Sequence, residues 1–198
     1  MYNWRKLSSD DQAALLQWRQ RMQRPWHCPP HFVDGPGSFH LTSACYEHAA
    51  IVGATTERMG EFTINLLDTL TVAGASVHAW CLLPNHYHLL IHAQELKVVT
   101  GALAKLHGRS SFAWNGGDHQ RGRKVWCAPA DRFIRSDSHF WATLNYIHHN
   151  PVRHGYVKHW QDWPFSSAAD YLATVGRDEA MRIWKAFPIL DYGAGWDD

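Results

Sequence analysis

Two histidines separated by one residue, His86 and His88, are the first residues in the sequence whose type and spacing could do chemistry. They lie in the segment HYHLLIHA, which is typical of a β-strand. Side chains two apart on a strand leave the same face, roughly 7 Å apart along the chain, so both imidazoles could hold one metal ion while Tyr87 points the other way. The alternative is a pair of partly buried histidines with ordinary hydrogen-bond partners. Two ligands do not complete a metal site, so a third must come from elsewhere.

A second group of candidates lies in the segment LNYIHHNPVRHG, which predicts a helix. Its core face is expected to comprise three apolar residues, Phe140, Leu144 and Ile147. Tyr146 and Asn150 are four residues apart and therefore share one side of the helix, roughly 90–130° from the centre of that core face. We therefore expect the Tyr146 hydroxyl to face a cleft. Because a proline disfavours helical geometry in the residue before it, we expect the helix to stop before Pro151 and Asn150 to leave helical geometry. The alternative is an interfacial tyrosine followed by an asparagine cap.

The elements that must position these residues follow from hydrophobic periodicity. Strands are predicted over residues 38–46, 76–83 and 86–93 and around 131–135, and helices over 56–73, 98–114 and 138–149. The order is strand, helix, strand, strand, helix, strand, helix. The order predicts an α+β protein of the ferredoxin-like split βαβ type: a four-stranded antiparallel sheet with helices on one face, plus an additional helix that carries the tyrosine.

Three regions are expected along the chain. Residues 1–37 are interpreted as an N-terminal arm and linker, with a helix from Ser9 to about Arg24. Residues 38–174 form the predicted domain, and residues 175–198 an acidic C-terminal tail.

Composition limits the class of protein. The chain has 198 residues, 45% of them hydrophobic and 19% charged, as expected for a globular domain. No apolar run approaches the roughly 20 residues of a membrane span, and the N-terminus lacks the apolar core of a signal peptide, so we expect a cytoplasmic protein. The sequence contains no HExxH motif, which argues against a zincin protease. The four cysteines form no CxxC pair, which argues against a zinc ribbon and favours reduced thiols.

Positive charge is concentrated in one segment although the net charge is only +1. Residues 105–135 hold two acids, Asp118 and Asp131, and seven basic residues: Lys105, Arg109, Arg121, Arg123, Lys124, Arg132 and Arg135. Such a segment could follow a phosphate backbone, and the alternative is a solvated protein surface.

Three strings of the sequence together resemble a known family. PNHYHLLI, YIHHNPVRHGYV and DWPFSS are similar to the REP-associated tyrosine transposases, a branch of the single-tyrosine HUH transposases. "HUH" denotes two histidines around a bulky hydrophobic residue, here His86-Tyr87-His88. The similarity runs from about Phe39 to Tyr171.

The resemblance implies a ferredoxin-like fold in a bacterial, nucleoid-associated protein. It implies that Tyr146 is the nucleophile, that His86 and His88 bind the metal, and that Asn150 completes the metal site. Many relatives outside this branch carry glutamine at the position of Asn150. Two imidazoles and an amide oxygen suit Mn²⁺ or Mg²⁺, and imidazoles also accept zinc.

The function implied is cleavage and rejoining of single-stranded DNA by transesterification. Attack by the tyrosine would leave a 5′-phosphotyrosine and a free 3′-hydroxyl, and the stored ester energy makes ATP unnecessary for rejoining. The implied substrate is a repetitive extragenic palindrome, a hairpin with a short single-stranded foot. We expect a monomer rather than a homodimer.

Basic residues are expected to bind the DNA backbone: Lys105, Arg109, Arg121, Arg123, Arg132 and Arg153. Two other functions remain open. One is a domesticated protein that binds DNA hairpins without cutting them, and the other is a metal-dependent nuclease that uses water as its nucleophile.

Overall fold

The computed structural model describes residues 8–11, 13–14, 17 and 35–189. Most of the helix predicted over residues 9–24, the linker that follows it and Cys28 lie outside these residues. Within the described residues, Cys45, Cys81 and Cys127 form no disulfide.

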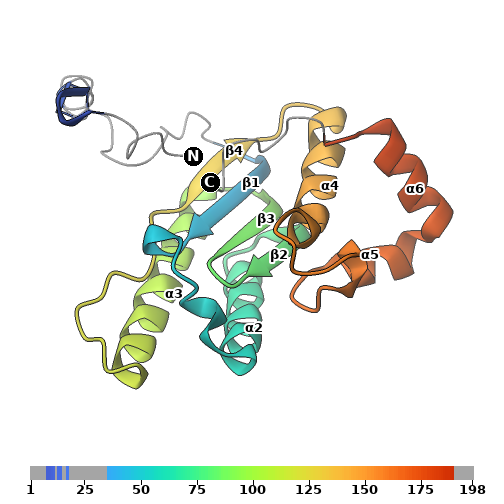
Figure 1. The fold of residues 1–198 in the computed structure, drawn as a ribbon. Helices are drawn as coiled ribbons and strands as arrows, with labels where there is room; N and C mark the ends of the chain where they lie inside the picture. Colours follow the sequence, from blue (N-terminus) through green and yellow to red (C-terminus); the bar gives the residue numbers. More distant parts are fainter. Residues whose placement is uncertain (1–7, 12, 15–16, 18–34, 190–198) are drawn as a thin grey trace.

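A four-stranded sheet forms the centre of the fold (Figure 1). Its strands are β1 (Gly37–Ala44), β2 (Ser76–Leu83), β3 (His86–Ala93) and β4 (Ala130–Phe133). They lie in the order β2-β3-β1-β4, and every neighbouring pair is antiparallel. The connections place helix α2 between β1 and β2 and helix α3 between β3 and β4. This arrangement confirms the predicted ferredoxin-like fold.

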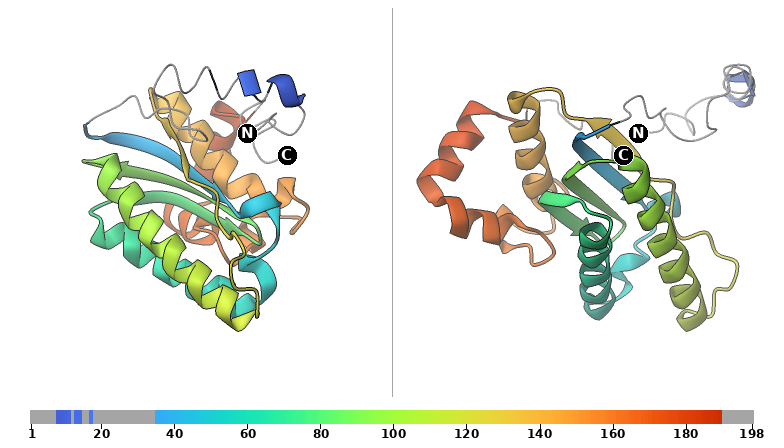
Figure 2. Two further views of the ribbon diagram at one scale, coloured as in Figure 1. Left: turned by 90° about the vertical axis from the view of Figure 1, so that its left-hand side faces the viewer. Right: turned by 180° about the vertical axis from the view of Figure 1, so that it is seen from behind.

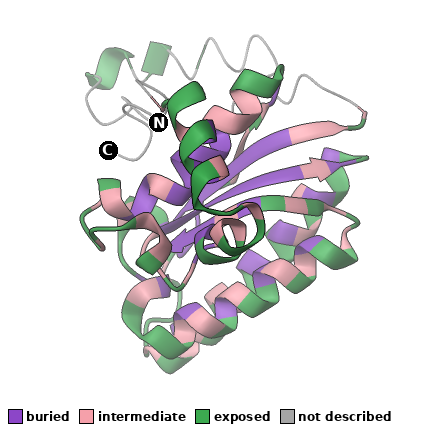
Figure 3. Cartoon of the chain, turned by 90° about the vertical axis from the view of Figure 1, so that its right-hand side faces the viewer, coloured by how far each residue is buried: buried purple, intermediate pink, exposed green. Residues whose placement is uncertain are grey.

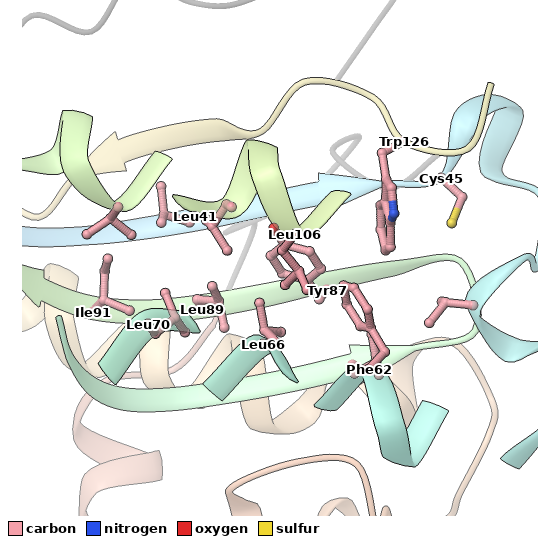
Figure 4. Close-up of a cluster of buried hydrophobic side chains, with 14 of the residues drawn as sticks. Leu41, Cys45, Phe62, Leu66, Leu70, Tyr87, Leu89, Ile91, Leu106 and Trp126 are labelled. Carbon is pink, nitrogen blue, oxygen red and sulfur yellow. The ribbon is translucent and has the colours of Figure 1, made fainter. Parts of the chain in front are cut away.

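Helices α2 (Thr56–Val72) and α3 (Leu96–Gly117) cover one face of the sheet (Figure 2). The main core lies between these helices and the inward-facing strand residues, which include Leu41, Leu89 and Ile91 (Figure 4). Helix α2 is followed by Gly74, whose φ of +74° suits a residue without a Cβ atom. The two crossover helices therefore leave the opposite face of the sheet for other elements.

Helix α4 (Asp137–Arg153) packs on that opposite face, mainly over β2 and β3. Its N-cap is Ser136, whose side chain accepts a hydrogen bond from the backbone N–H of His139. The prediction that the helix stops before Pro151 is wrong, because the helix continues to Arg153 and Asn150 remains helical. A proline removes one backbone donor. Here that loss falls close to the helix end, and burial of Pro151 against the protein offsets it.

Two short helices after α4 were not predicted from the sequence. A 3-10 turn, η4 (Trp160–Asp162), leads to α5 (Ala168–Val175) and α6 (Arg177–Ala186), and these elements pack around α4. Helix α6 lies within the region interpreted as an acidic tail, residues 175–198. None of the helices that the structure describes is both long and apolar enough to cross a membrane.

The DWPFSS segment closes the open edge of the sheet at β2. The backbone N–H of Leu82 donates to the carbonyl of Phe165 at 2.8 Å, and the N–H of Ser167 donates to the carbonyl of Trp80 at 3.0 Å. The indole of Trp163 also donates to the Leu82 carbonyl at 2.8 Å. Edge strands present unpaired backbone groups, so this motif protects β2 and anchors α5 beside α4.

Candidate functional site

The two histidines of strand β3 leave the sheet on the side covered by α4. Tyr87, between them, points into the core formed with α2 and α3, as the strand period predicts. The imidazole centroids of His86 and His88 are 4.9 Å apart, and both side chains are buried. The strand alternation therefore directs both rings toward the same helix.

Helix α4 brings Tyr146 and Asn150 to this pair. The Tyr146 ring centroid lies 5.2 Å from that of His88, and Asn150 Oδ1 lies 3.3 Å from His86 Nε2. One helical turn separates Tyr146 from Asn150, so each faces a different histidine of the strand. This contact depends on the helix continuing through Pro151, because a break there would remove Asn150 from His86.

The expectation that the Tyr146 hydroxyl faces a cleft is not met. Tyr146 is only 1% exposed and packs in a second hydrophobic cluster with Leu83, Leu90 and Ile147. The position of Tyr146 around the helix axis gives its angle from the core face but not what covers the other faces of the helix. Most residues of the second half of α4 are buried, because the segments after the helix pack around it (Figure 3). A substrate therefore reaches Tyr146 only after neighbouring side chains move.

The orientation of His86 is fixed by its neighbour Asn85. His86 Nδ1 lies 2.7 Å from Asn85 Oδ1, and Asn85 Nδ2 donates to the carbonyl of His48 at 3.1 Å. Because an amide oxygen only accepts, Nδ1 carries the proton, and a neutral ring then presents a lone pair at Nε2. That lone pair faces Asn150 Oδ1, which is also an acceptor. Two acceptors at this separation repel each other unless a cation or a proton lies between them.

This donor set fits a divalent cation. Neighbouring ligands of an octahedral ion with bonds of roughly 2.1 Å are roughly 3 Å apart, close to the His86–Asn150 separation. Asn150 Nδ2 has no hydrogen-bond partner among the described residues. In the part of the chain that the structure describes, no group of three or more His, Cys, Asp or Glu residues could hold a metal. Asn150 is therefore the candidate for a third ligand beside His86 and His88.

His40 is a site residue that the sequence reasoning missed. It lies on β1, and its Nε2 is 3.2 Å from Nδ1 of His88. Its ring is also 5.8 Å from that of Tyr146. A histidine in an apolar strand segment was the available signal, but its relation to His88 depends on the β1–β3 register. Metal-binding imidazoles usually engage their second nitrogen in this way, which fixes the tautomer.

Two further residues at the end of α4 approach the site. The His154 ring lies 5.2 Å from that of His86. The Arg153 guanidinium lies 5.8 Å from the Tyr146 ring centroid, within cation–π range, and the residue is exposed. Arg153 therefore places a positive charge close to the ring of Tyr146.

The other basic residues predicted to bind DNA are divided between two faces. Arg132 is paired with His40 across β1 and β4, so both side chains leave the same face of the sheet. Lys105 and Arg109 are exposed on α3, which covers the opposite face. Of the six candidates, the structure therefore brings Arg132 and Arg153 to the side of the site.

Arg121 and Arg123, in the segment after α3, are engaged with the protein itself. Arg123 pairs with Asp118 at 2.6 Å, and Arg58 binds the same carboxylate. These two arginines hold the pKa of Asp118 at about 2. Arg121 donates to the carbonyl of Phe112 at 2.9 Å.

His148, the first of the two consecutive histidines in YIHHNP, has a structural position. Its Nε2 lies 2.9 Å from Ser167 Oγ, and burial lowers its pKa to about 3. Ser167 Oγ in turn accepts from the Trp80 backbone N–H at 2.9 Å. His148 therefore connects α4 to the DWPFSS segment and the edge of the sheet.

No protein-family model matches the sequence, but comparisons with individual proteins find relatives that carry the same family name. A Haemophilus influenzae protein named for the REP-associated tyrosine transposases is 34% identical over 133 aligned positions, in an alignment that covers 57% of this chain and 69% of that protein. The REP-associated tyrosine transposase of Escherichia coli K12 is 28% identical over 130 aligned positions, in an alignment that covers 60% of this chain and 67% of the relative. A solved structure of a REP-associated tyrosine transposase bound to a REP hairpin has the same fold. It gives a TM-score of 0.58 at 21% identity and covers 73% of this chain and 84% of that chain.

Proposed function

The chain belongs to the REP-associated tyrosine transposases, and we propose that it cuts and rejoins single-stranded DNA at palindromic hairpins through a covalent bond to Tyr146. The observation that carries the proposal is the convergence of four side chains, two from α4 and two from β3. The Tyr146 ring lies 5.2 Å from the His88 ring, and the Asn150 amide oxygen lies 3.3 Å from His86 Nε2. A nucleophile beside a cation-binding donor set suits phosphoryl transfer.

The proposed reaction exchanges one phosphate ester for another. The Tyr146 hydroxyl oxygen attacks the phosphorus, the bond between phosphorus and the 3′ oxygen breaks, and the 3′ oxygen leaves as a hydroxyl. The phenol proton passes to a base or to water. The downstream strand is then joined by its 5′ phosphate to Tyr146. Attack by a 3′-hydroxyl on the same phosphorus reverses the step and restores the tyrosine.

His86, His88 and Asn150 would hold a divalent cation, Mg²⁺ or Mn²⁺. When bound there, such an ion withdraws charge from the phosphate oxygens that repel the nucleophile. Asn85 and His40 hold the two imidazoles through their Nδ1 atoms, and this directs Nε2 of His86 toward Asn150. The protein thus fixes its ligands before the substrate arrives.

The partner we propose is a DNA hairpin with unpaired flanking nucleotides. The solved relative with the same fold is bound to a REP hairpin. Exposed Arg132 and Arg153, on the side of the site, supply positive charge for the backbone of such a strand. We propose that the chain acts as a monomer.

A covalent adduct is the decisive product. The protein is incubated with an end-labelled single-stranded hairpin and Mn²⁺, and the products are separated on a denaturing gel. We expect a protein–DNA adduct and a free 3′ fragment from the unaltered protein. Tyr146→Phe should abolish the adduct, whereas Tyr156→Phe, which changes an exposed tyrosine at 44% exposure, should retain it.

The same gel distinguishes the alternatives. Cleavage that survives Tyr146→Phe would indicate a nuclease that uses water. Hairpin binding without any cleavage, over a series of hairpins and both metals, would indicate a domesticated DNA-binding protein.

A further inference from the structure

A cavity of about 290 Å³ lies on the side of α4 turned away from the sheet. It is enclosed by α4, the η4 turn, α5 and α6, and its lining includes Asn145 and His148 of α4. It is therefore separate from the group formed by Tyr146, His86 and His88, although it shares a helix with the tyrosine. The reaction described above gives this cavity no role.

Aromatic rings form much of its wall. From α4, His148 is stacked with Trp160 of η4, with centroids 5.9 Å apart and planes 8° apart, and contacts Tyr171 of α5 at 5.1 Å. Farther along the cavity, His149 contacts Trp184 of α6 at 5.0 Å. Flat aromatic walls favour a flat aromatic ligand, because stacking maximises contact without demanding a particular edge.

Polar groups accompany these rings. The lining residues His149 and Tyr171 carry buried atoms, Nδ1 and the hydroxyl, that have no hydrogen-bond partner among the described residues. Arg177, at the start of α6, lines the cavity and is exposed to solvent. A ligand with hydrogen-bonding edges and an attached phosphate would match both features.

We propose that this cavity takes one unpaired nucleobase of the bound DNA strand. The inference rests on the proposed function, which supplies single-stranded DNA as substrate. A nucleobase is planar, has donors and acceptors on its edge, and carries a phosphate that Arg177 can meet. An α-helix with its side chains is about 10–12 Å across, so a strand that passes around α4 can reach both the cavity and Tyr146 within a few nucleotides.

The test combines base removal in the DNA with changes in the cavity. Binding of a labelled hairpin is measured for the intact DNA and for a series in which each unpaired position in turn is abasic. Base stacking on aromatic residues predicts that one abasic position weakens binding about 5- to 150-fold. Trp184→Ala should weaken binding of the intact DNA by a similar factor. In this variant, making that one position abasic should cause no further loss of affinity, whereas the effects of the other abasic positions should be unchanged.

A second variant controls for the case in which Trp184→Ala disturbs folding. Met181→Trp starts from an exposed residue of the lining, at 47% exposure, and fills the cavity without removing its walls. In the Met181→Trp protein too, the same abasic position should cause no further loss of DNA affinity. Ile64→Ala, an exposed change on α2 across the sheet, is the control and should leave the abasic series unchanged.

The outcomes separate the two proposals. If the unaltered protein binds and cuts the hairpin, but neither cavity variant alters the penalty at any abasic position, the cavity inference is wrong and the proposed function stands. If the unaltered protein neither binds nor cuts any single-stranded hairpin, both proposals fail together.

Discussion

His40 Nε2 lies 3.2 Å from Nδ1 of His88, across the pairing of β1 with β3. A nitrogen held in this way cannot turn toward the site, so the other nitrogen of His88 is the one available as a ligand. Asn85 acts on His86 in the same manner from within the same turn. The paired imidazoles thus depend on two residues outside the proposed ligand set, and His40 comes from a different strand.

Replacing His40 should weaken metal binding. His40→Phe removes the partner of His88 Nδ1, and loss of such a partner typically costs about 10- to 100-fold in metal affinity. His40→Gln can still offer an amide oxygen to the Nδ1–H group and should restore part of the loss. Mn²⁺ affinity is measured by calorimetry without DNA. Equal affinities for the Phe variant and the unaltered protein would show that His40 does not position His88.

Asn150→Leu should separate metal binding from folding. In the absence of metal this change removes an acceptor that faces another acceptor, so thermal stability should hardly fall. A cation at a hundred times its dissociation constant stabilises a protein by about 2.7 kcal/mol, and the variant should lose most of this gain. Melting temperatures with and without Mn²⁺ provide the measurement.

A matched control for that experiment is Asn65→Leu on α2, an exposed asparagine that donates to the Glu61 carbonyl. It should keep the full metal-dependent rise in melting temperature. A rise of equal size in the Asn150→Leu protein would remove Asn150 from the proposed ligands.

The fold should lose stability below neutral pH, in part through His107. Burial lowers the pKa of His107 from 6.5 to about 4, and its Nε2 lies 3.0 Å from the Tyr87 hydroxyl in the core. Between these values the unfolded chain binds a proton that the folded protein does not, so stability is complete above pH 6.5 and falls toward pH 4. The difference corresponds to about 3 kcal/mol.

Urea unfolding at a series of pH values checks this prediction. His107→Gln should flatten the loss of stability between pH 6.5 and pH 4, whereas the exposed change His159→Gln should leave the slope as it is. An unchanged slope in His107→Gln would assign the acid sensitivity to other groups.

The basic residues should differ in how they affect DNA binding. Arg132→Gln and Arg153→Gln should each reduce the slope of log affinity against log salt concentration by about 1, as expected for loss of one phosphate contact. Arg123→Gln breaks the pair with Asp118 and should lower stability by on the order of 1 kcal/mol. Hairpin binding at several salt concentrations, together with melting curves, distinguishes these effects.

The same experiment can compare variants of Arg121 and Arg123 with variants of Arg132 and Arg153. The sequence predicts that removing Arg121 and Arg123 flattens the salt dependence. Their contacts with Phe112 and Asp118 give each a role within the protein, so we expect the larger change of slope from Arg132 and Arg153. A larger change from Arg121 and Arg123 would move the DNA path to the α3 side of the sheet.

The sequence by itself determined the four strands, helices α2, α3 and most of α4, and the family. Alternation in HYHLLIHA gave β3 its bounds and turned Tyr87 away from the two histidines, and the order of strands and helices gave the ferredoxin-like topology. These features are local, or follow from connections that the chain order restricts strongly. The roles of Tyr146, His86, His88 and Asn150 in chemistry stay predictions, although the structure brings all four together.

Tertiary structure decided what surrounds those residues. The position of His40 beside His88 depends on strand register, which links residues 48 apart in the sequence. The burial of Tyr146 depends on packing by segments that follow α4, and the passage of the helix through Pro151 depends on burial that compensates a lost hydrogen bond. Each results from contacts between distant parts of the chain, and neither periodicity nor local propensity carries that information.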